Sequence, residues 1–207
     1  MTESATAAAL LDAAEARFAV DGIEAASLRA VMRDAGTDPG AVHYHFKGRE
    51  ALAEAVLDRT LVPLNARRLE LLDELEADPT PPSIEALVDA LVRPDVEVAA
   101  ALEARGSGRA RLLGAIYLEP SAFVTAQVER RFAPVATRFM PPMVAALPST
   151  DPSTLAWRVR WCLFGTLGAV LFDPDEVADQ TSHALADRLI PPLAAALAAP
   201  TTTRSTA

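Results

Sequence analysis

A short segment, Asp38–Phe46, combines small and hydrogen-bonding residues at a spacing that suits close approach to another molecule. In a helix each residue turns by about 100°, so one face presents Gly40 and Tyr44, with His43 on its flank. Small residues early on an exposed face let a helix come close to base edges in a DNA groove. The chemistry that this pattern predicts is recognition of a nucleic acid.

Other chemistries are not indicated by the residue types. His43 and His45 stand two positions apart, which puts them on different helix faces, and the single cysteine, Cys162, is distant in sequence. These spacings predict no metal site. We find no nucleophile elbow, no glycine-rich phosphate loop and no convincing Ser/His/Asp set. We therefore expect a protein without a cofactor that is not an enzyme.

Two further helices are predicted to position the segment. The first covers about Ser4 to Val20, with Leu10, Ala14 and Phe18 on one stripe. The second begins at Ser27, whose hydroxyl can accept a hydrogen bond from the first turn. Its buried face follows helical spacing at Leu28, Val31, Met32 and Ala35.

The junction between the second and third helices has the composition of a tight turn. Gly36 suits the left-handed residue beyond a helix end. Asp38 is a good N-cap, and Pro39 fits the first helical position, so we expect a third helix that ends near Phe46 with Val42, His45 and Phe46 inward. Two helices joined in this way, the second short, match a helix-turn-helix.

The rest of the chain also has a helical pattern. Strand signals are nearly absent, and Ala/Leu/Glu/Arg stretches separated by Gly and Pro predict an all-α fold of about nine helices. We expect a three-helix helix-turn-helix domain over 1–50 and a helical domain over 51–199. A connecting helix is predicted over about 49–77, with a kink or break at Pro63, and residues 200–207 should form a disordered tail.

Composition limits the function classes. The 207 residues are 51% hydrophobic, with no signal peptide, and the longest apolar run, near 162–172, is shorter than the about 18 residues of a membrane span. We therefore expect a cytoplasmic protein with no membrane partner. The net charge of −9 disfavours nucleic-acid binding, so the cations must be local. Ser27–Glu50 has four basic and three acidic residues, which predicts modest non-specific affinity and a shallow salt dependence.

The segment from Ser27 to Leu52 resembles the tetracycline-repressor (TetR) family. The shared pattern is a hydroxyl residue, a hydrophobe and a basic residue at 27–29, Ala-Gly at 35–36, aromatic residues at 44–46, and Lys-Gly-Arg-Glu-Ala-Leu at 47–52. The resemblance is strong over about Ser4 to Leu61. Beyond it, the likeness rests on length and helical content.

The resemblance implies DNA contacts for ten residues. Arg29 corresponds to the groove-facing arginine, which can hold a guanine through two hydrogen bonds. His45 corresponds to a residue that packs inward and can reach the DNA backbone. The remaining positions correspond to phosphate contacts at Ser27, Thr37, Tyr44, Lys47 and Arg49, and to base-facing positions at Pro39, Gly40 and His43.

Two features depart from the family pattern. Pro39-Gly40-Ala41 offers few donors, so base reading there should depend on apolar contact, such as with thymine methyl groups. Asp38 replaces a hydroxyl residue; we favour a role as helix cap over a role as cytosine reader.

For the C-terminal half, the resemblance implies a small-molecule site and a homodimer interface. An apolar effector could bind among Tyr117, Glu119, Phe123, Trp157, Trp161 and Phe164. A two-helix contribution to a dimer could include Gly165, Gly168, Leu185, Leu189 and Leu193. Internal core packing is the alternative for both sets.

These expectations lead to one function and one alternative. The expected function is a sequence-specific transcriptional regulator, a dimeric repressor that a small molecule releases from a palindromic DNA operator. The alternative is a helical scaffold or nucleoid-associated DNA-binding protein without an effector.

Overall fold

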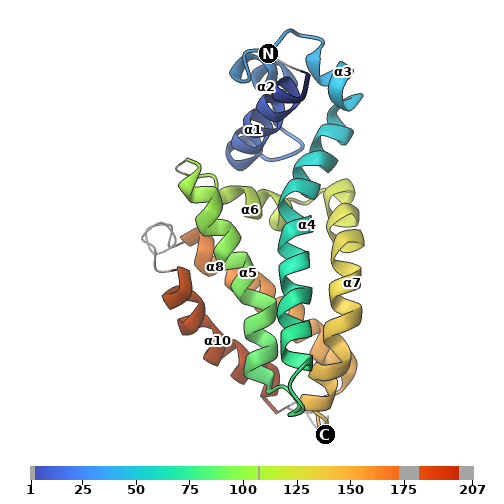
Figure 1. The fold of residues 1–207 in the computed structure, drawn as a ribbon, viewed down its shortest axis with the longest axis vertical. Coiled ribbons are helices and arrows are strands. Elements are labelled where there is room, and N and C mark those ends of the chain that lie inside the picture. Colours follow the sequence, from blue (N-terminus) through green and yellow to red (C-terminus); the bar gives the residue numbers. More distant parts are fainter. Residues whose placement is uncertain (1–2, 107, 173–181, 201–207) are drawn as a thin grey trace, which may run out of the picture. The chain divides into compact units, whose positions relative to one another are not determined.

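In the computed structural model, which describes residues 3–106, 108–172 and 182–200, the chain forms nine α-helices and no strand within these ranges (Figure 1). This confirms the predicted all-α fold of about nine helices. None of the described helices combines the length and apolar character needed to cross a membrane. Except for Pro200, the predicted disordered tail lies outside the described residues.

The chain divides into two compact units, which we describe separately. Unit 1 contains Met1–Asn65 and Val98–Phe132, and unit 2 contains Ala66–Glu97 and Ala133–Ala207. Three helices have residues in both units: α4 (Arg49–Glu76), α5 (Ile84–Ala104) and α7 (Ala122–Ala146). Helix α4 continues through Pro63, although proline removes one hydrogen bond of the helix.

Unit 1 begins with three helices, α1 (Glu3–Asp21), α2 (Leu28–Asp34) and α3 (Ala41–Phe46), in which α1 packs against both of the others. The predicted stripe of α1 is fully buried at Leu10, Ala14 and Phe18. In α2, Val31 and Met32 are buried and Leu28 is half-buried, as is Ala35, the C-cap of this helix. Gly36 has the predicted left-handed conformation, with φ of 64°. We call α1–α3 with their two connections the head.

The start of α3 differs from the prediction. The helix begins at Ala41 after Gly40, and the cap position has no side-chain hydrogen bond, so Asp38 is not the N-cap. The Ala41 N–H instead donates to the carbonyl oxygen of Asp38, 3.0 Å away. Gly40 has φ −92° and ψ −7°, which match the third residue of a type I turn, and proline suits the second. Asp38-Pro39-Gly40-Ala41 therefore prefers a turn to the first turn of a helix.

Unit 2 contains α8 (Pro152–Phe172) packed against α10 (Ser182–Ala198). The Arg158 guanidinium donates to the carbonyl oxygens of Leu197 and Ala199, at 2.7 and 2.6 Å, so it caps the C-terminal end of α10. Deeper in the unit, the buried Arg68 side chain donates to Asp95 and to the Leu91 carbonyl oxygen. The core of unit 2 thus contains an ion pair.

Candidate nucleic-acid interface

Helix α2 presents Arg29 outward from a capped N-terminus. Ser27 has extended backbone angles, and its hydroxyl accepts from the Ala30 N–H at 3.5 Å, as the sequence predicted for a cap. Val31 and Met32 face inward, whereas Arg29, on the flank of this buried face, is exposed. A long cationic side chain is thereby held on the outside of a helix whose start is fixed.

Helix α3 has one inward and one exposed face, as the periodicity predicted. Val42 is buried, and His45 and Phe46 are half-buried. His43 is exposed, and the Tyr44 side chain is 65% exposed. The Tyr44 and His45 rings meet edge to face, with centroids 4.9 Å apart. Pro39 and Gly40, in the turn before α3, are exposed as well. The outward face therefore has small residues at its start and hydrogen-bonding side chains further along.

A left-handed lysine ends α3. Lys47 has φ 64°, the one positive φ among the described non-glycine residues, and its N–H donates to the His43 carbonyl oxygen at 3.0 Å. A side chain in this conformation costs about 1 kcal/mol or more. Gly48 follows with φ 139°, and α4 begins at the next residue. This tight connection leaves the Lys47 side chain exposed beside α3.

Two of the predicted phosphate contacts also hold the head together. The Thr37 hydroxyl donates to the Met32 carbonyl oxygen at 3.2 Å, and Thr37 is half-buried. Arg49 Nη1 donates to the carbonyl oxygens of Ile23 and Glu24, each at 3.3 Å. A guanidinium has five N–H donors, so Arg49 can make these bonds and still offer others to phosphate.

An acidic residue beside this surface is neutralised by its neighbours. Nε and Nη2 of Arg17 each lie 2.5 Å from Asp34 Oδ2, and Arg33 contacts Oδ1. The hydrogen bond from Arg17 is the main reason that the pKa of Asp34 is lowered. Asp34 therefore stays ionised but paired, which reduces its repulsion of phosphate. The sequence did not predict this role of Arg17, because no local spacing links positions 17 and 34.

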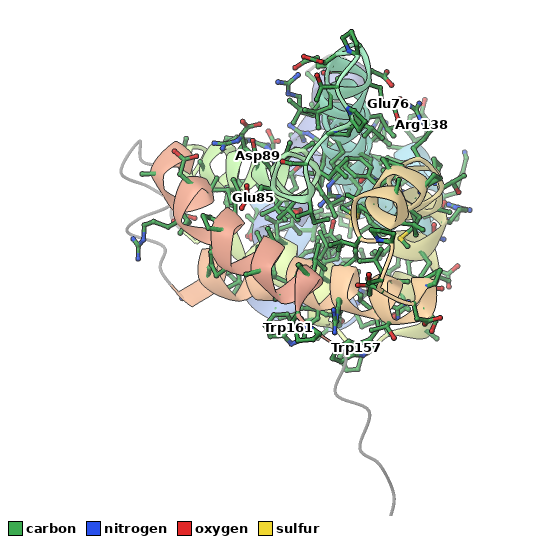
Figure 2. The ribbon with its side chains drawn as sticks, turned by 90° about the horizontal axis from the view of Figure 1, so that it is seen from below. Glu76, Glu85, Asp89, Arg138, Trp157 and Trp161 are labelled. Carbon is green, nitrogen blue, oxygen red and sulfur yellow. The ribbon has the colours of Figure 1, made fainter. Side chains whose placement is uncertain are left out.

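The six residues predicted as a ligand pocket are divided between the units. Tyr117, Glu119 and Phe123 are half-buried in unit 1, and the Glu119 carboxylate accepts hydrogen bonds from the backbone N–H groups of Ile23 and Glu24. The other three lie on α8 in unit 2 and are exposed: Trp157 by 66%, Trp161 by 54% and Phe164 by 44%. Figure 2 shows both tryptophans on the outward side of α8.

The residues predicted for a dimer interface differ in exposure. Leu185 and Leu193 are buried within the single chain, and the Cys162 thiol donates to the Leu193 carbonyl oxygen at 3.8 Å. Gly165 is exposed, whereas Gly168 and Leu189 are half-buried. In the structure, Leu185 and Leu193 therefore contribute to the core between α8 and α10. Among the described residues, no group of histidine, cysteine, aspartate and glutamate side chains is arranged to hold a metal ion.

Two family models match the chain. The model described as "Bacterial regulatory proteins, tetR family" matches residues 10–56, and "Tetracyclin repressor-like, C-terminal domain" matches residues 89–199. The chain belongs to the TetR family. The first match includes α2 and α3 with the exposed residues described above, which makes this TetR-family protein a DNA-binding transcriptional regulator. Comparison with curated protein sequences finds no match.

Solved structures of similar fold include several regulators. The fatty acid degradation regulator FadR from Bacillus halodurans has a TM-score of 0.65 at 12% identity, over 91% of this chain and 94% of that one. FadR from Bacillus subtilis, in complex with stearoyl-CoA, has a TM-score of 0.59 at 13% identity, over 89% and 97%. SmeT in complex with triclosan has a TM-score of 0.58 at 21% identity, over 89% and 90%. At these identities the likeness establishes the shared fold.

Proposed function

We propose that this TetR-family regulator is a repressor that binds a palindromic operator as a homodimer and is released by a small-molecule effector. The observation that carries the proposal is the division of α2 and α3 into a buried apolar side and an exposed hydrogen-bonding side. On the exposed side, Arg29 would read a guanine, and His43 would face base edges beside Pro39 and Gly40. Phosphate contacts would come from Ser27, Thr37, Tyr44, Lys47 and Arg49, with His45 supporting Tyr44.

An apolar surface on α8 supports the homodimer. Trp157, Trp161 and Phe164 are all exposed there, and large aromatic side chains are enriched where protein surfaces associate. We propose that a second copy of the chain covers this surface, with Gly165 and Gly168 on the same helix permitting close approach. A two-fold dimer would bring two copies of α3 to successive major grooves of a symmetric duplex, about 34–36 Å apart.

The class of effector is proposed from relatives. One FadR structure contains stearoyl-CoA and the SmeT structure contains triclosan, two ligands with large apolar parts. We propose a mostly apolar effector for this protein, which would act in the cytoplasm. The effector would lower DNA affinity only to the extent that it prefers a dimer whose two heads do not fit the operator. A chain whose DNA affinity no such ligand changes would instead fit a nucleoid-associated protein.

Substitutions on α2 test the DNA-reading role. Arg29→Ala should weaken binding to a selected duplex by about tenfold or more and relax the preference for one guanine, since a bidentate base contact is lost. Arg33→Ala is the matched control, because it removes the same charge from the same helix at another exposed position. It should leave the sequence preference unchanged. Equal loss of affinity in both variants, with the same preferred duplex, would refute base reading by Arg29.

A further inference from the structure

One turn of the head has its backbone held by two distant side chains. The N–H groups of Ile23 and Glu24 donate to the Glu119 carboxylate, at 2.6 and 2.8 Å. The carbonyl oxygens of the same two residues accept from Arg49. All four backbone polar groups of this dipeptide are thus bonded by one anion and one cation. Charge-assisted hydrogen bonds are the stronger kind, so the turn is firmly fixed.

The residues beside the turn fit this arrangement. Gly22 has φ +84°, and a Cβ there would lie 3.4 Å from an oxygen of the Glu119 carboxylate. That distance is an ordinary van der Waals contact, so glycine is favoured here by the backbone conformation and not by space. The hydroxyl of the buried Ser121 donates to the Glu24 side chain at 2.5 Å, which adds a second link to the same turn.

The segment that contains Glu119 is also attached to α1 at its other end. Helix α6 (Arg111–Leu118) packs against α1, and Glu119 follows its last residue. Before α6, Arg105 lies 2.8 Å from both Asp12 and the buried Glu15 of α1. Contacts at both ends thus tie α6 and its flanking residues to the head within unit 1.

The fixed turn directly precedes the DNA-reading helix. Only Ala25 and Ala26 separate Glu24 from Ser27, the N-cap of α2, and Arg29 is the second residue of that helix. A shift of the turn must therefore shift the start of α2 and with it Arg29. Positional errors of this kind weaken hydrogen bonds to bases, which depend strongly on geometry.

We propose that Glu119 is a positioning residue for DNA binding: through the Ile23–Glu24 turn it sets the place of Arg29 on the duplex. The role rests on the proposed function, since it requires that the head reads DNA. Glu119 itself touches no DNA in this role. It instead links the DNA affinity of the head to the position of α6, nearly a hundred residues away in sequence.

The test compares Glu119→Gln with Glu129→Gln, a matched control that removes the same charge from an exposed position of α7 in the same unit. A glutamine oxygen can accept from the turn, but its NH₂ group cannot, so one backbone N–H loses its acceptor. We expect Glu119→Gln to raise the Kd for a selected duplex by about tenfold. The control should stay within about twofold of the wild type, or bind slightly more tightly because a negative charge is gone.

Hydrogen exchange separates the turn from the DNA. In the free Glu119→Gln protein, the Ile23 and Glu24 amides should exchange about tenfold faster than in the wild type, and unchanged exchange overturns the proposal. If the wild type binds no duplex, the proposed function is refuted. If it binds and Glu119→Gln matches Glu129→Gln in affinity, the positioning role alone is overturned.

A measurement without substitution covers the case in which Glu119→Gln does not fold. Coupling is reciprocal, so a duplex that prefers the held turn must also stabilise it. Exchange at Ile23 and Glu24 in the wild-type protein should therefore slow when the duplex is added, although neither residue is on the proposed DNA-facing side. Exchange that is the same with and without duplex contradicts the positioning role.

Discussion

The buried ion pair of unit 2 offers a prediction about stability. Arg68 is 1% exposed, its Nη2 lies 2.5 Å from Asp95 Oδ2, and its Nε donates to the Leu91 carbonyl oxygen at 2.8 Å. Asp95→Asn removes the carboxylate that pairs with the buried guanidinium, and an arginine does not lose its proton. Arg68→Met leaves a buried carboxyl, which can take up a proton. The two variants should therefore respond differently to pH.

The magnitudes follow from the burial. Removing one partner of a buried ion pair costs about 3–5 kcal/mol, and Asp95→Asn should lose about this amount at pH 7. Burial raises the pKa of Asp95 against the opposing effect of Arg68, so Arg68→Met should raise that pKa further. The pKa of this carboxyl group is then higher in the folded protein than the value of about 3.9 in the unfolded chain. Such a group contributes stability that is present at low pH and is lost as the pH rises through the folded-state pKa.

The loss in Arg68→Met should therefore shrink by about 1.4 kcal/mol for each pH unit below the folded pKa of Asp95, down to about pH 4. Urea unfolding followed by circular dichroism at pH 5, 6, 7 and 8 measures the free energies of unfolding of both variants. All other titratable groups are the same in the two variants, so the difference between their free energies of unfolding isolates the titration of Asp95. Parallel pH profiles, or a loss below about 1 kcal/mol in Asp95→Asn, would refute this reasoning.

Three further predictions concern separate parts of the molecule. Lys47→Gly should raise the free energy of unfolding, because the left-handed φ of 64° suits glycine. The same substitution should lower the slope of log Kd against log salt by about 0.9, because one phosphate contact is lost. An unchanged slope contradicts that contact. The double substitution Trp157→Ser and Trp161→Ser should convert the dimer to a monomer in analytical ultracentrifugation with the helical circular dichroism retained; a persistent dimer contradicts the α8 interface. Burial raises the pKa of the Cys162 thiol to about 11, so maleimide at pH 8 should label the folded protein at least about a hundredfold more slowly than the unfolded chain, and fast labelling would contradict the burial.

Much of the head could be predicted from sequence because its determinants are local. The buried stripe of α1, the Ser27 cap and the left-handed Gly36 depend on residues within one or two helical turns. The two faces of α3 follow from periodicity in the same way. The start of α3 was mispredicted because Asp38-Pro39 suits a type I turn as well as a helix N-terminus, and Gly40 favours the turn.

Contacts between residues far apart in the chain could not be predicted from the sequence. Glu119 was predicted as a pocket residue, but its hydrogen bonds go to a turn about 95 residues earlier, which no spacing rule anticipates. Arg49 is a second example. Its position in the family pattern implies a phosphate contact, whereas in the structure its guanidinium donates to the carbonyl oxygens of Ile23 and Glu24 in the head. Periodicity also did not indicate whether the aromatic residues of α8 point into a core, and Trp157 and Trp161 are exposed.

Selection of bound duplexes from a random pool by the full-length protein tests DNA reading by the head most directly, because the operator sequence need not be known. We expect strong enrichment of a two-fold symmetric consensus, with half-site centres one helical turn or a multiple of it apart, about 10–10.5 base pairs per turn. Within each half-site, one guanine should lose its preference when Arg29→Ala is used for the selection. Enrichment no greater than that of the Arg29→Ala, Tyr44→Ala double variant, or a consensus without two-fold symmetry, would contradict dimeric, sequence-specific binding.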